Sequence, residues 1–409
     1  MSDYIEHSRE PLKPVVTTPA ELATCLDALA SADGPVAFDA ERAHGYRYWP
    51  KAYLFQIRRQ GAGTWLIDPL PFEQEGLGSL VQATGDAEWV IHAASQDLPC
   101  MRDIGIVPPR IFDTELGGRL LGKPGVALGM LLKYELGIKL RKAHSAVNWS
   151  TRPLRESWLT YAALDVDYLI ELRDSIDAQL ASVGRAEWAR EEFDWELRHH
   201  SSPPSPPAEP WRRLSGITNL RSSRQLALAR ELWLERDAIA RHRDRPPSHI
   251  VSDLAIVELA GLARPEAPMP GPEALRAVAG FGTPSARRYR TNWITALNKA
   301  AELPERRYPA RRPKPTGLPH PKAWERTNPD ASRRWDQVRP RIDALACELS
   351  FQSSLIAPPA VIQQAVFEAT HEAPSAARLQ ELGARPWQAG FLAPLLQEAL
   401  PEHSPGSAD

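Results

Sequence analysis

The amino-acid sequence predicts an α/β protein in which a first domain with a central sheet is followed by two small all-α bundles. Up to about residue 200, short apolar runs typical of strands alternate with helical stretches. Beyond that point, apolar residues recur every three or four positions and strand-like alternation is missing. Two proline-rich stretches separate the blocks. Since proline fits neither helix interiors nor central strands, these stretches are expected to be linkers.

Length and cysteine content indicate several domains in a reducing compartment. The 409 residues exceed what one hydrophobic core usually serves. Cys25, Cys100 and Cys347 are odd in number and far apart, which fits neither a disulfide framework nor a cysteine-based zinc site. The polar start of the chain lacks a signal-peptide core, and no apolar stretch approaches the roughly 18 residues of a membrane span. We expect a cytoplasmic monomer without a membrane partner.

The first block, residues 15–200, contains the elements of the predicted sheet. Four runs have strand character, namely PVAFDAE, AYLFQIRR, TWLIDPL and EWVIHAA, and a helical pattern extends from about residue 155 to about residue 180. A linker follows at 201–211, where proline and serine replace residues that could pack (SSPPSPPAEP).

The second block, 212–300, and the third, 327–400, are each expected to form a small helical bundle. Their periodicity is clearest in LALARELWLERDAIARHR and DQVRPRIDALACELS. Between them, residues 301–326 alternate prolines with arginines and lysines, which is typical of an extended basic linker. The third block faintly resembles the second, which favours a divergent duplicate rather than a repeat array.

Charge is distributed unevenly, although the formal net charge is only −2. From Arg212 to Arg326 the chain carries 22 Arg and Lys against 11 Asp and Glu, a net charge of +11 that leaves −13 for the remainder. This asymmetry suits a module that binds a polyanion, joined to a domain rich in carboxylates. Two solvated surfaces of opposite charge are the alternative interpretation.

Two carboxylates stand two positions apart at the end of the first predicted strand. Because side chains alternate along a strand, Asp39 and Glu41 point to the same face. Their charges repel unless a cation lies between them, and their hard oxygen atoms suit Mg²⁺ or Mn²⁺. A solvated strand end would have the same pattern, so further residues decide the interpretation.

Further acidic and aromatic candidates follow in chain order. Asp97 lies where a predicted strand gives way to a helix, a position from which a carboxylate faces a cleft at the sheet edge. Tyr161 and Asp165 are four residues apart in a predicted helix and therefore occupy one face, one turn apart. Taken singly, Asp97 is more often a helix-capping acid, and Tyr161 with Asp165 more often a packed aromatic beside a solvated acid.

Taken together, the motifs FDAE, HAASQD and YAALD resemble the three exonuclease motifs of the DEDD superfamily, in its tyrosine-containing branch. The segment KAHSAVNWSTRPLRESWLTYAALDVDYL resembles ribonuclease D, including Trp149 and the Arg-Pro-Leu run at 152–154. The resemblance covers most of residues 30–180. It implies a ribonuclease H-like exonuclease domain with a central mixed sheet.

The same resemblance implies a role for each of the five residues. Asp39, Glu41, Asp97 and Asp165 match the acidic positions that hold two divalent cations, Mg²⁺ or Mn²⁺. Tyr161 matches the tyrosine that positions the attacking water. An unperturbed phenol has a pKa near ~10, so we expect it to orient the water rather than take its proton.

Three neighbouring positions are assigned more modest roles. Asp113 matches a family position outside the ligand set, and a structural hydrogen bond is expected for it. His92 could steady the cation ligands, but a satisfied core histidine explains it at least as well, so it is not counted among the site residues. Ala40 replaces the threonine of the usual acid-threonine-glutamate motif, so the ligands remain but one supporting contact is in doubt.

Nucleic-acid contacts are expected at two places. Arg47, Tyr48 and Lys51 follow the first motif in a loop near the site, where they could hold the terminal nucleotides or simply form a hairpin edge. Residues 212–300 resemble the HRDC domain, through LARELWLERDAIARHRDRPPSHIVSD and GFGTPSARRYRTNW. Within it, candidate phosphate contacts lie beside an expected helix start that Gly280 and Gly282 open, and these are Arg287, Arg288 and Arg290.

The sequence therefore predicts a 3′→5′ exoribonuclease that acts on RNA with a free 3′ end. The resemblance to ribonuclease D suggests tRNA precursors and other stable RNAs as substrates and nucleoside 5′-monophosphates as products. A 3′→5′ DNA exonuclease is an alternative within catalysis. A non-catalytic nucleic-acid-binding protein that kept the fold is an alternative of another class.

Overall fold

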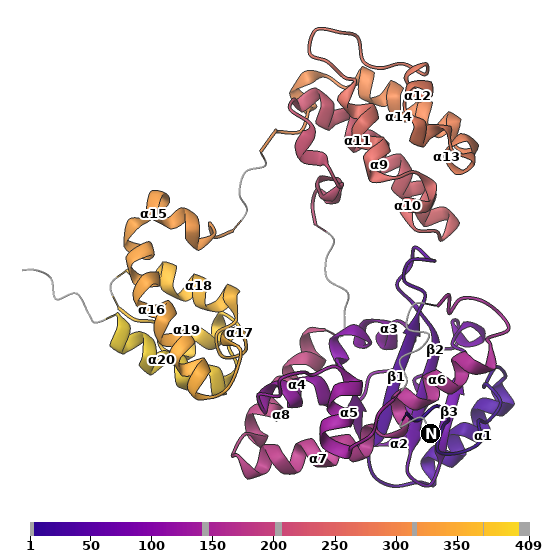
Figure 1. The fold of residues 1–409 in the computed structure, drawn as a ribbon, viewed down its shortest axis with the longest axis vertical. Coiled ribbons are helices and arrows are strands. Elements are labelled where there is room, and N and C mark those ends of the chain that lie inside the picture. The colour runs from indigo at the N-terminus through magenta and orange to yellow at the C-terminus, as the bar shows by residue number, and fades with distance from the viewer. Residues whose placement is uncertain (1–3, 141–146, 201–206, 313–316, 371, 401–409) are drawn as a thin grey trace, which may run out of the picture.

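The computed structural model describes residues 4–140, 147–200, 207–312, 317–370 and 372–400. Figure 1 shows one α/β body and two helical bodies. The predicted fold class is confirmed, because the first body has a mixed sheet and the described residues from 207 onward form helices without a strand. None of the described helices is long and apolar enough to cross a membrane.

A five-stranded sheet in the order β3-β2-β1-β4-β5 forms the centre of the first body. β1 is antiparallel to β2 and parallel to β4, β2 is antiparallel to β3, and β4 is parallel to β5. Four strands overlap the four predicted runs, and the fifth, β5, was not predicted. The strands are β1 Val36–Arg42, β2 Ala52–Arg59, β3 Gly63–Ile67, β4 Glu88–Ile91 and β5 Arg110–Asp113.

Helices cover this sheet and carry part of its core. Within β1, Phe38 packs against the rings of Phe55 and Trp89 at centroid distances of 5.3 and 5.1 Å, so one face of the strand is fixed in the core. The helices and turns of this body are α1 Pro19–Ala30, η1 Leu70–Phe72, α2 Ser79–Thr84, η2 Ala94–Gln96, α3 Leu98–Asp103, α4 Thr114–Leu120, α5 Leu128–Leu136, α6 Glu156–Asp167, α7 Leu169–Ser182 and α8 Ala186–His199.

The helix predicted from about residue 155 to about residue 180 is in fact two helices, α6 and α7. Tyr168 separates them, with φ −122° and ψ 6°, outside the α-helical region. The buried Asp167 carboxylate just before it accepts hydrogen bonds from the Ser8 and Thr64 hydroxyls and the Arg9 N–H. These tertiary contacts end α6 where the helical pattern alone predicts continuation.

The second body has its own core between α9, α11 and α14. Trp293 is buried there, and its indole N–H donates to the Ala286 carbonyl at 2.8 Å. α9 begins with a capping box in which the Ser222 hydroxyl and the Gln225 side chain satisfy each other's backbone N–H groups. The elements are η3 Pro210–Arg213, η4 Ile217–Asn219, α9 Ser223–Arg243, α10 Pro247–Ile250, α11 Asp253–Gly261, α12 Ala274–Ala277, η5 Ala279–Gly282, α13 Pro284–Arg288, α14 Arg290–Glu302 and η6 Glu305–Arg307.

The third body shares a continuous core with the first. Trp188 of α8 stacks on Trp387 at 5.2 Å and meets Phe391 edge to face at 5.3 Å. The buried Glu192 carboxylate accepts hydrogen bonds from Arg385 and from the Trp387 indole. α8 therefore belongs to both bodies. The elements are η7 Pro321–Ala323, α15 Trp324–Thr327, α16 Pro329–Glu348, α17 Ser353–Ile356, α18 Pro359–Glu368, α19 Ala376–Glu381 and α20 Pro386–Ala399.

Candidate active site

Three of the predicted carboxylates converge where α6 crosses the sheet. Asp39 and Glu41 extend from β1 on the face opposite Phe38, and Asp165 extends toward them from α6. One oxygen from each carboxylate lies within 4.8 Å of the others. The buried Ala162 and Ala163 of α6 belong to one core cluster with Leu54 of β2, which fixes α6 against the sheet.

The fourth predicted carboxylate, Asp97, lies beside this group. β1 and β4 are parallel neighbours, so their carboxyl ends lie at the same edge of the sheet. The segment that follows β4 and carries Asp97 therefore begins beside Asp39. Asp97 is 3% exposed and shares a hydrogen bond with Asp39. Its Oδ1 also accepts a hydrogen bond from the Arg42 guanidinium at 2.8 Å.

Burial and mutual repulsion make these carboxylates hard to ionise together. Burial is the largest cause that raises the pKa of Glu41 to about 10, followed by the charges of Asp39, Asp165 and Asp97. The pKa values of the other three are also raised, in each case chiefly by burial. A divalent cation would remove this penalty, because it compensates the negative charges directly.

The buried amide of Gln56 also fits a bound cation. Gln56 on β2 is paired with Asp39 in the antiparallel ladder, so the two side chains lie on the same face of the sheet. Gln56 is 0% exposed, and neither its Nε2 nor its Oε1 has a hydrogen-bond partner among the described residues. An orphaned buried amide on the same face as Asp39 suits a hydrated cation, whose water would satisfy it.

Tyr161 lies one turn before Asp165 on α6 and forms a hydrogen bond with it. Burial, followed by the charges of Asp165 and Glu41, raises the pKa of this phenol well above its usual value. The hydroxyl therefore stays protonated and donates hydrogen bonds. This is consistent with an orienting group and argues against a general base.

Asp113 holds the segment that leads to Asp97. Its carboxylate accepts four backbone N–H groups, from Ala93 and Ala94 at 3.0 and 2.8 Å and from Glu115 and Leu116 at 2.8 and 3.2 Å. It thus caps α4 and fixes the turn after β4 at once. The predicted structural hydrogen bond is confirmed.

His92 is satisfied within the protein rather than directed at the carboxylates. Its Nδ1 lies 2.9 Å from the Thr114 hydroxyl. Burial lowers the pKa of the imidazole to about 4, so the ring is neutral at physiological pH.

Two of the three predicted nucleic-acid residues in the loop after β1, Arg47 and Tyr48, contact α9 or the residue that ends it. Arg47 approaches Asp244 at 3.4 Å, and the Tyr48 N–H donates to the same carboxylate at 3.0 Å. The Tyr48 hydroxyl donates to Asp237 at 2.8 Å. Contact of these side chains with nucleic acid stays a prediction.

Beyond this contact, the loop exposes other groups. Lys51 pairs with Glu73 at 2.5 Å. Tyr46 and Trp49 are 40% and 47% exposed, and the Trp49 ring meets the Tyr48 ring edge to face at 5.1 Å. Neither Tyr46 nor Trp49 was predicted as a nucleic-acid contact, because the sequence does not show which side chains of a loop stay exposed.

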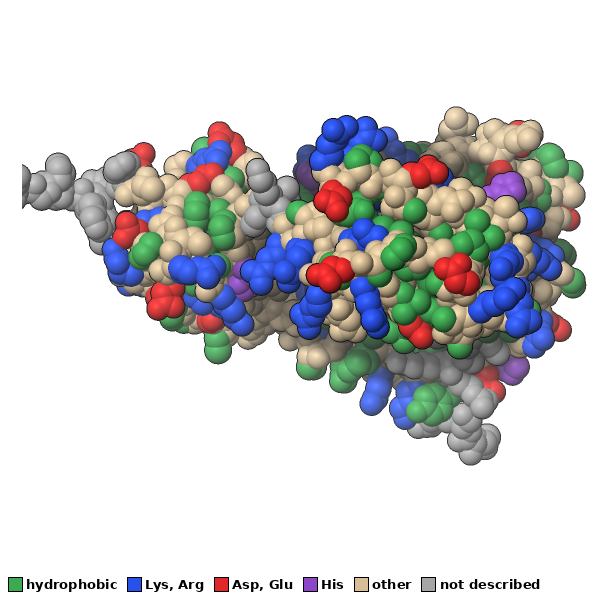
Figure 2. All heavy atoms as spheres, turned by 90° about the horizontal axis from the view of Figure 1, so that it is seen from above, with side chains coloured by type: hydrophobic (Ala, Val, Ile, Leu, Met, Phe, Trp, Pro, Cys, Tyr) green, Lys and Arg blue, Asp and Glu red, His purple; other side chains and the backbone are tan. Residues whose placement is uncertain are grey.

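The three predicted arginines of the second body are exposed and lie around α13. Among the described residues, Arg287, Arg288 and Arg290 form no ion pair with an acid. Gly280 lies in the turn η5 rather than at a helix start, since α13 begins at Pro284 with Thr283 as its cap. Figure 2 shows groups of Lys and Arg side chains on this view of the molecule, with acidic side chains scattered between them.

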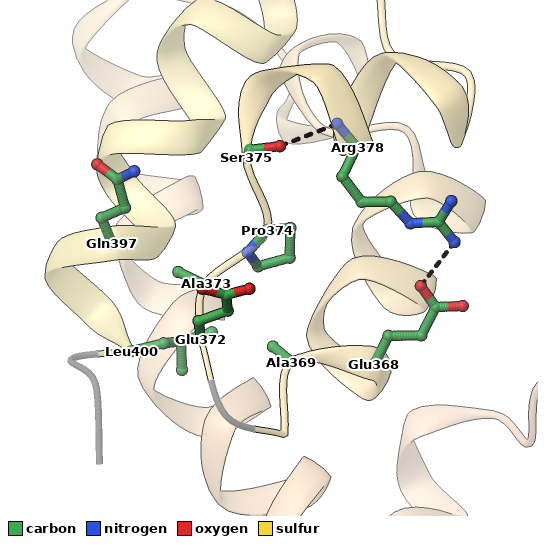
Figure 3. Close-up of a pocket in the computed structure, with 9 residues that line it drawn as sticks. All are labelled: Glu368, Ala369, Glu372, Ala373, Pro374, Ser375, Arg378, Gln397 and Leu400. Carbon is green, nitrogen blue, oxygen red and sulfur yellow. Dashed lines mark hydrogen bonds and ion pairs between the residues drawn. The ribbon is translucent and has the colours of Figure 1, made fainter. Parts of the chain in front are cut away.

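Two hollows lie on the third body, away from the carboxylates. One, of about 720 Å³, is lined in part by Glu368, Pro374 and Arg378 (Figure 3). Glu368 forms an ion pair with Arg378 at 2.9 Å. The other, of about 680 Å³, is lined in part by Lys322 and Trp335. Neither hollow contains any of the five predicted catalytic residues.

Family models match all three bodies. A model described as a 3′-5′ exonuclease matches residues 14–181, and the HRDC domain model matches residues 225–297. Residues 317–400 match a model described as a 3′ to 5′ exonuclease C-terminal domain. The HRDC match covers the second body, so the hypothesis that the third body is a divergent HRDC copy stays a prediction.

Individual proteins give the same picture. Ribonuclease D of Pseudomonas paraeruginosa (strain DSM 24068 / PA7) is 32% identical over 283 residues, covering 68% of this chain and 73% of that protein. The crystal structure of a protein from Bifidobacterium adolescentis is 32% identical, with a TM-score of 0.87, covering 97% of this chain and 99% of that one. Escherichia coli RNase D shares the fold at 23% identity and a TM-score of 0.63, covering 95% and 99% of the two chains.

The sheet, the carboxylate site and the matched exonuclease model together define a 3′→5′ exonuclease with an attached HRDC domain. The level of similarity to curated relatives then identifies the family. The chain belongs to the ribonuclease D family, whose members are 3′→5′ exoribonucleases.

Proposed function

We propose that this protein hydrolyses the terminal phosphodiester of RNA 3′ ends, with Asp39, Glu41, Asp97 and Asp165 holding two divalent cations, Mg²⁺ or Mn²⁺. The observation that carries the proposal is the convergence of three carboxylates within 4.8 Å, beside a fourth. Two such cations, when bound, polarise the scissile phosphate, lower the pKa of a water and neutralise the leaving oxygen. Nucleoside 5′-monophosphates are the products.

The protein's own groups would then orient and confine the reaction. Tyr161 keeps its proton and donates a hydrogen bond that orients the attacking water in line with the phosphate. Asp113 keeps the segment that carries Asp97 in place through its four backbone contacts. The unpartnered Gln56 amide would donate to a water beside Asp39.

Substrate choice is assigned to the basic part of the chain. Arg287, Arg288 and Arg290 are proposed to contact phosphates upstream of the 3′ end, supported by their exposure and their lack of acidic partners among the described residues. We propose tRNA precursors and other stable RNAs as substrates, as the resemblance of the motifs to ribonuclease D implies. Three free cysteines support a reducing compartment such as the cytoplasm, and we propose that the protein acts there as a monomer.

A trimming assay tests the proposal. RNA labelled at its 5′ end is incubated with the full-length protein in Mg²⁺ or Mn²⁺, and we expect a ladder that shortens from the 3′ end and disappears with EDTA. Asp165→Asn should abolish trimming, whereas Asp103→Asn, which changes an exposed acid at the end of α3, should not. Undiminished trimming by Asp165→Asn would refute the assignment.

Substrate class is tested in the same assay. A DNA strand of the same sequence is expected to be trimmed more slowly than the RNA. Faster trimming of the DNA would favour the DNA exonuclease alternative. Binding of RNA without trimming, in either cation, would favour the non-catalytic alternative.

A further inference from the structure

Arg42 is the last residue of β1 and directly follows Glu41. The β1–β2 ladder changes register between these two residues, because Glu41 pairs with Leu54 whereas Arg42 pairs with Ala52. Such an irregularity changes the direction in which the final side chain of a strand leaves it. The Arg42 side chain is only 15% exposed, so it lies against the protein rather than in solvent.

The Arg42 guanidinium lies in direct contact with the candidate active site. Its Nη1 is 2.8 Å from Asp97 Oδ1 and also donates to the Gln96 carbonyl oxygen. The Asp97 side chain is 4% exposed, so this charge-assisted hydrogen bond is shielded from water and correspondingly strong. A monovalent cation of the protein itself thus occupies one oxygen of the fourth carboxylate.

Arg42 also compensates part of the negative charge of the acidic group. Among the described residues, Arg42 is the one basic side chain that forms an ion pair with any of the four carboxylates. Its charge lowers the pKa values of Asp39, Glu41 and Asp97, against the larger effect of burial. The cation-free site is therefore held together partly by this one side chain.

We propose that Arg42 is an internal counter-ion that competes with the divalent cation for Asp97. The inference rests on the proposed function, since it takes the carboxylates as cation ligands. While Arg42 holds Asp97 Oδ1, that oxygen is less available to a cation, which weakens cation binding. In return, its contact keeps Asp97 in position and limits repulsion while the site holds no cation.

Mn²⁺ binding to the full-length protein tests this, measured by electron paramagnetic resonance of free Mn²⁺ without RNA. Arg42→Gln removes the competing charge, and its affinity for Mn²⁺ should rise roughly tenfold above that of the wild type. Arg42→Lys keeps the charge and should bind nearly as weakly as the wild type. Arg102→Gln removes the same charge from an exposed position on α3 and should leave the affinity unchanged.

A double-mutant cycle separates competition from a general charge effect. With Asp97→Asn in both proteins, Arg42→Gln should no longer raise Mn²⁺ affinity, because the contested ligand is gone. An increase that persists in the Asp97→Asn background would overturn the proposal.

The remaining outcomes are also decisive. If the wild type binds Mn²⁺ and Arg42→Gln binds it equally or more weakly, only the counter-ion proposal fails. If the wild type binds no Mn²⁺, the proposed function fails as well. Should Arg42→Gln lose stability, its melting temperature in Mn²⁺ serves as the readout, and a Mn²⁺-induced rise no larger than that of the wild type contradicts the proposal.

Discussion

Tyr161 differs from the carboxylates in that its proposed role needs a proton rather than a charge. Replacing it with Phe removes the hydroxyl that orients the water but leaves the cation ligands intact. We expect Tyr161→Phe to lower the rate of single-turnover RNA trimming by roughly 100-fold or more, with little change in Mn²⁺ affinity. A variant that trims at the wild-type rate would show that the hydroxyl does not take part.

Gln56 allows a test that separates stability from function. Its buried amide has no partner among the described residues, so Gln56→Leu should leave the melting temperature in EDTA unchanged or raise it. Trimming should nevertheless slow by about tenfold, because a hydrogen bond near Asp39 is lost. Asn would not be a matched replacement, since it shortens the side chain. A Gln56→Leu protein with both lower stability and normal activity would contradict the positioning role.

His92 predicts a pH dependence of stability. Burial lowers its pKa in the folded state to about 4, below the usual value of 6.5, so the folded protein disfavours the charged ring. Its contribution to the free energy of unfolding is fully present above pH 6.5. This contribution is lost as the pH falls toward 4, by up to about 3 kcal/mol.

The comparison that isolates this effect is between the wild type and His92→Gln. Chemical unfolding at several pH values should show that the free energy of unfolding falls less steeply between pH 6.5 and 4 in the variant than in the wild type. Parallel profiles would mean that His92 titrates normally in the folded state.

At the residue scale, the order and spacing of the motifs were enough to select the acidic residues that the structure brings together. Alternation along β1 places Asp39 and Glu41 on one face, and helical spacing places Tyr161 beside Asp165. The contact of Arg42 could not be predicted, since it depends on an irregular strand pairing and on β4 lying next to β1.

At the scale of elements, the β1–β2 loop and the end of α9 form one unit. Asp244 ends α9 with a left-handed backbone, φ 47°, and its carboxylate accepts the N–H groups of Tyr48 and Trp49. The sequence pattern indicated a loop and a helix end, but their meeting requires the tertiary fold. The tyrosine predicted to bind RNA is thus already engaged, and Trp49 remains exposed beside it.

Asp244→Gly tests this contact without straining the backbone, because glycine adopts positive φ freely. We expect hydrogen exchange at the amides of Tyr48 and Trp49 to accelerate by roughly tenfold or more, since their acceptor is removed. The amides of Ala93 and Ala94, which are held by Asp113, provide the internal control. Unchanged exchange at the loop would mean that the contact does not persist in solution.

At the scale of the whole molecule, the three bodies are joined in different ways. The third shares a core with the first through α8, whereas the second has a core of its own, with Tyr48 packed against it. The blocks were predicted from composition and periodicity, but the shared core was not. In the sequence, Trp188 and Trp387 belong to separate predicted blocks, and only the structure shows that their rings stack.

This arrangement predicts the cooperativity of unfolding. The first and third bodies should unfold together, and Trp387→Ala should destabilise both by about 3 to 5 kcal/mol. The second body should keep its own transition, unchanged by that substitution. Differential scanning calorimetry would resolve this, and a third body that melts alone in the wild type would contradict the shared core.

The central claim is that the carboxylate site holds cations that contact the scissile phosphate of RNA. The most direct measurement uses RNA in which sulfur replaces one non-bridging oxygen of the terminal linkage. We predict slow trimming of this linkage in Mg²⁺, with the rate restored in Mn²⁺, which binds sulfur more readily. A rate that falls equally in both cations, with no restoration by Mn²⁺, would contradict cation contact with the phosphate.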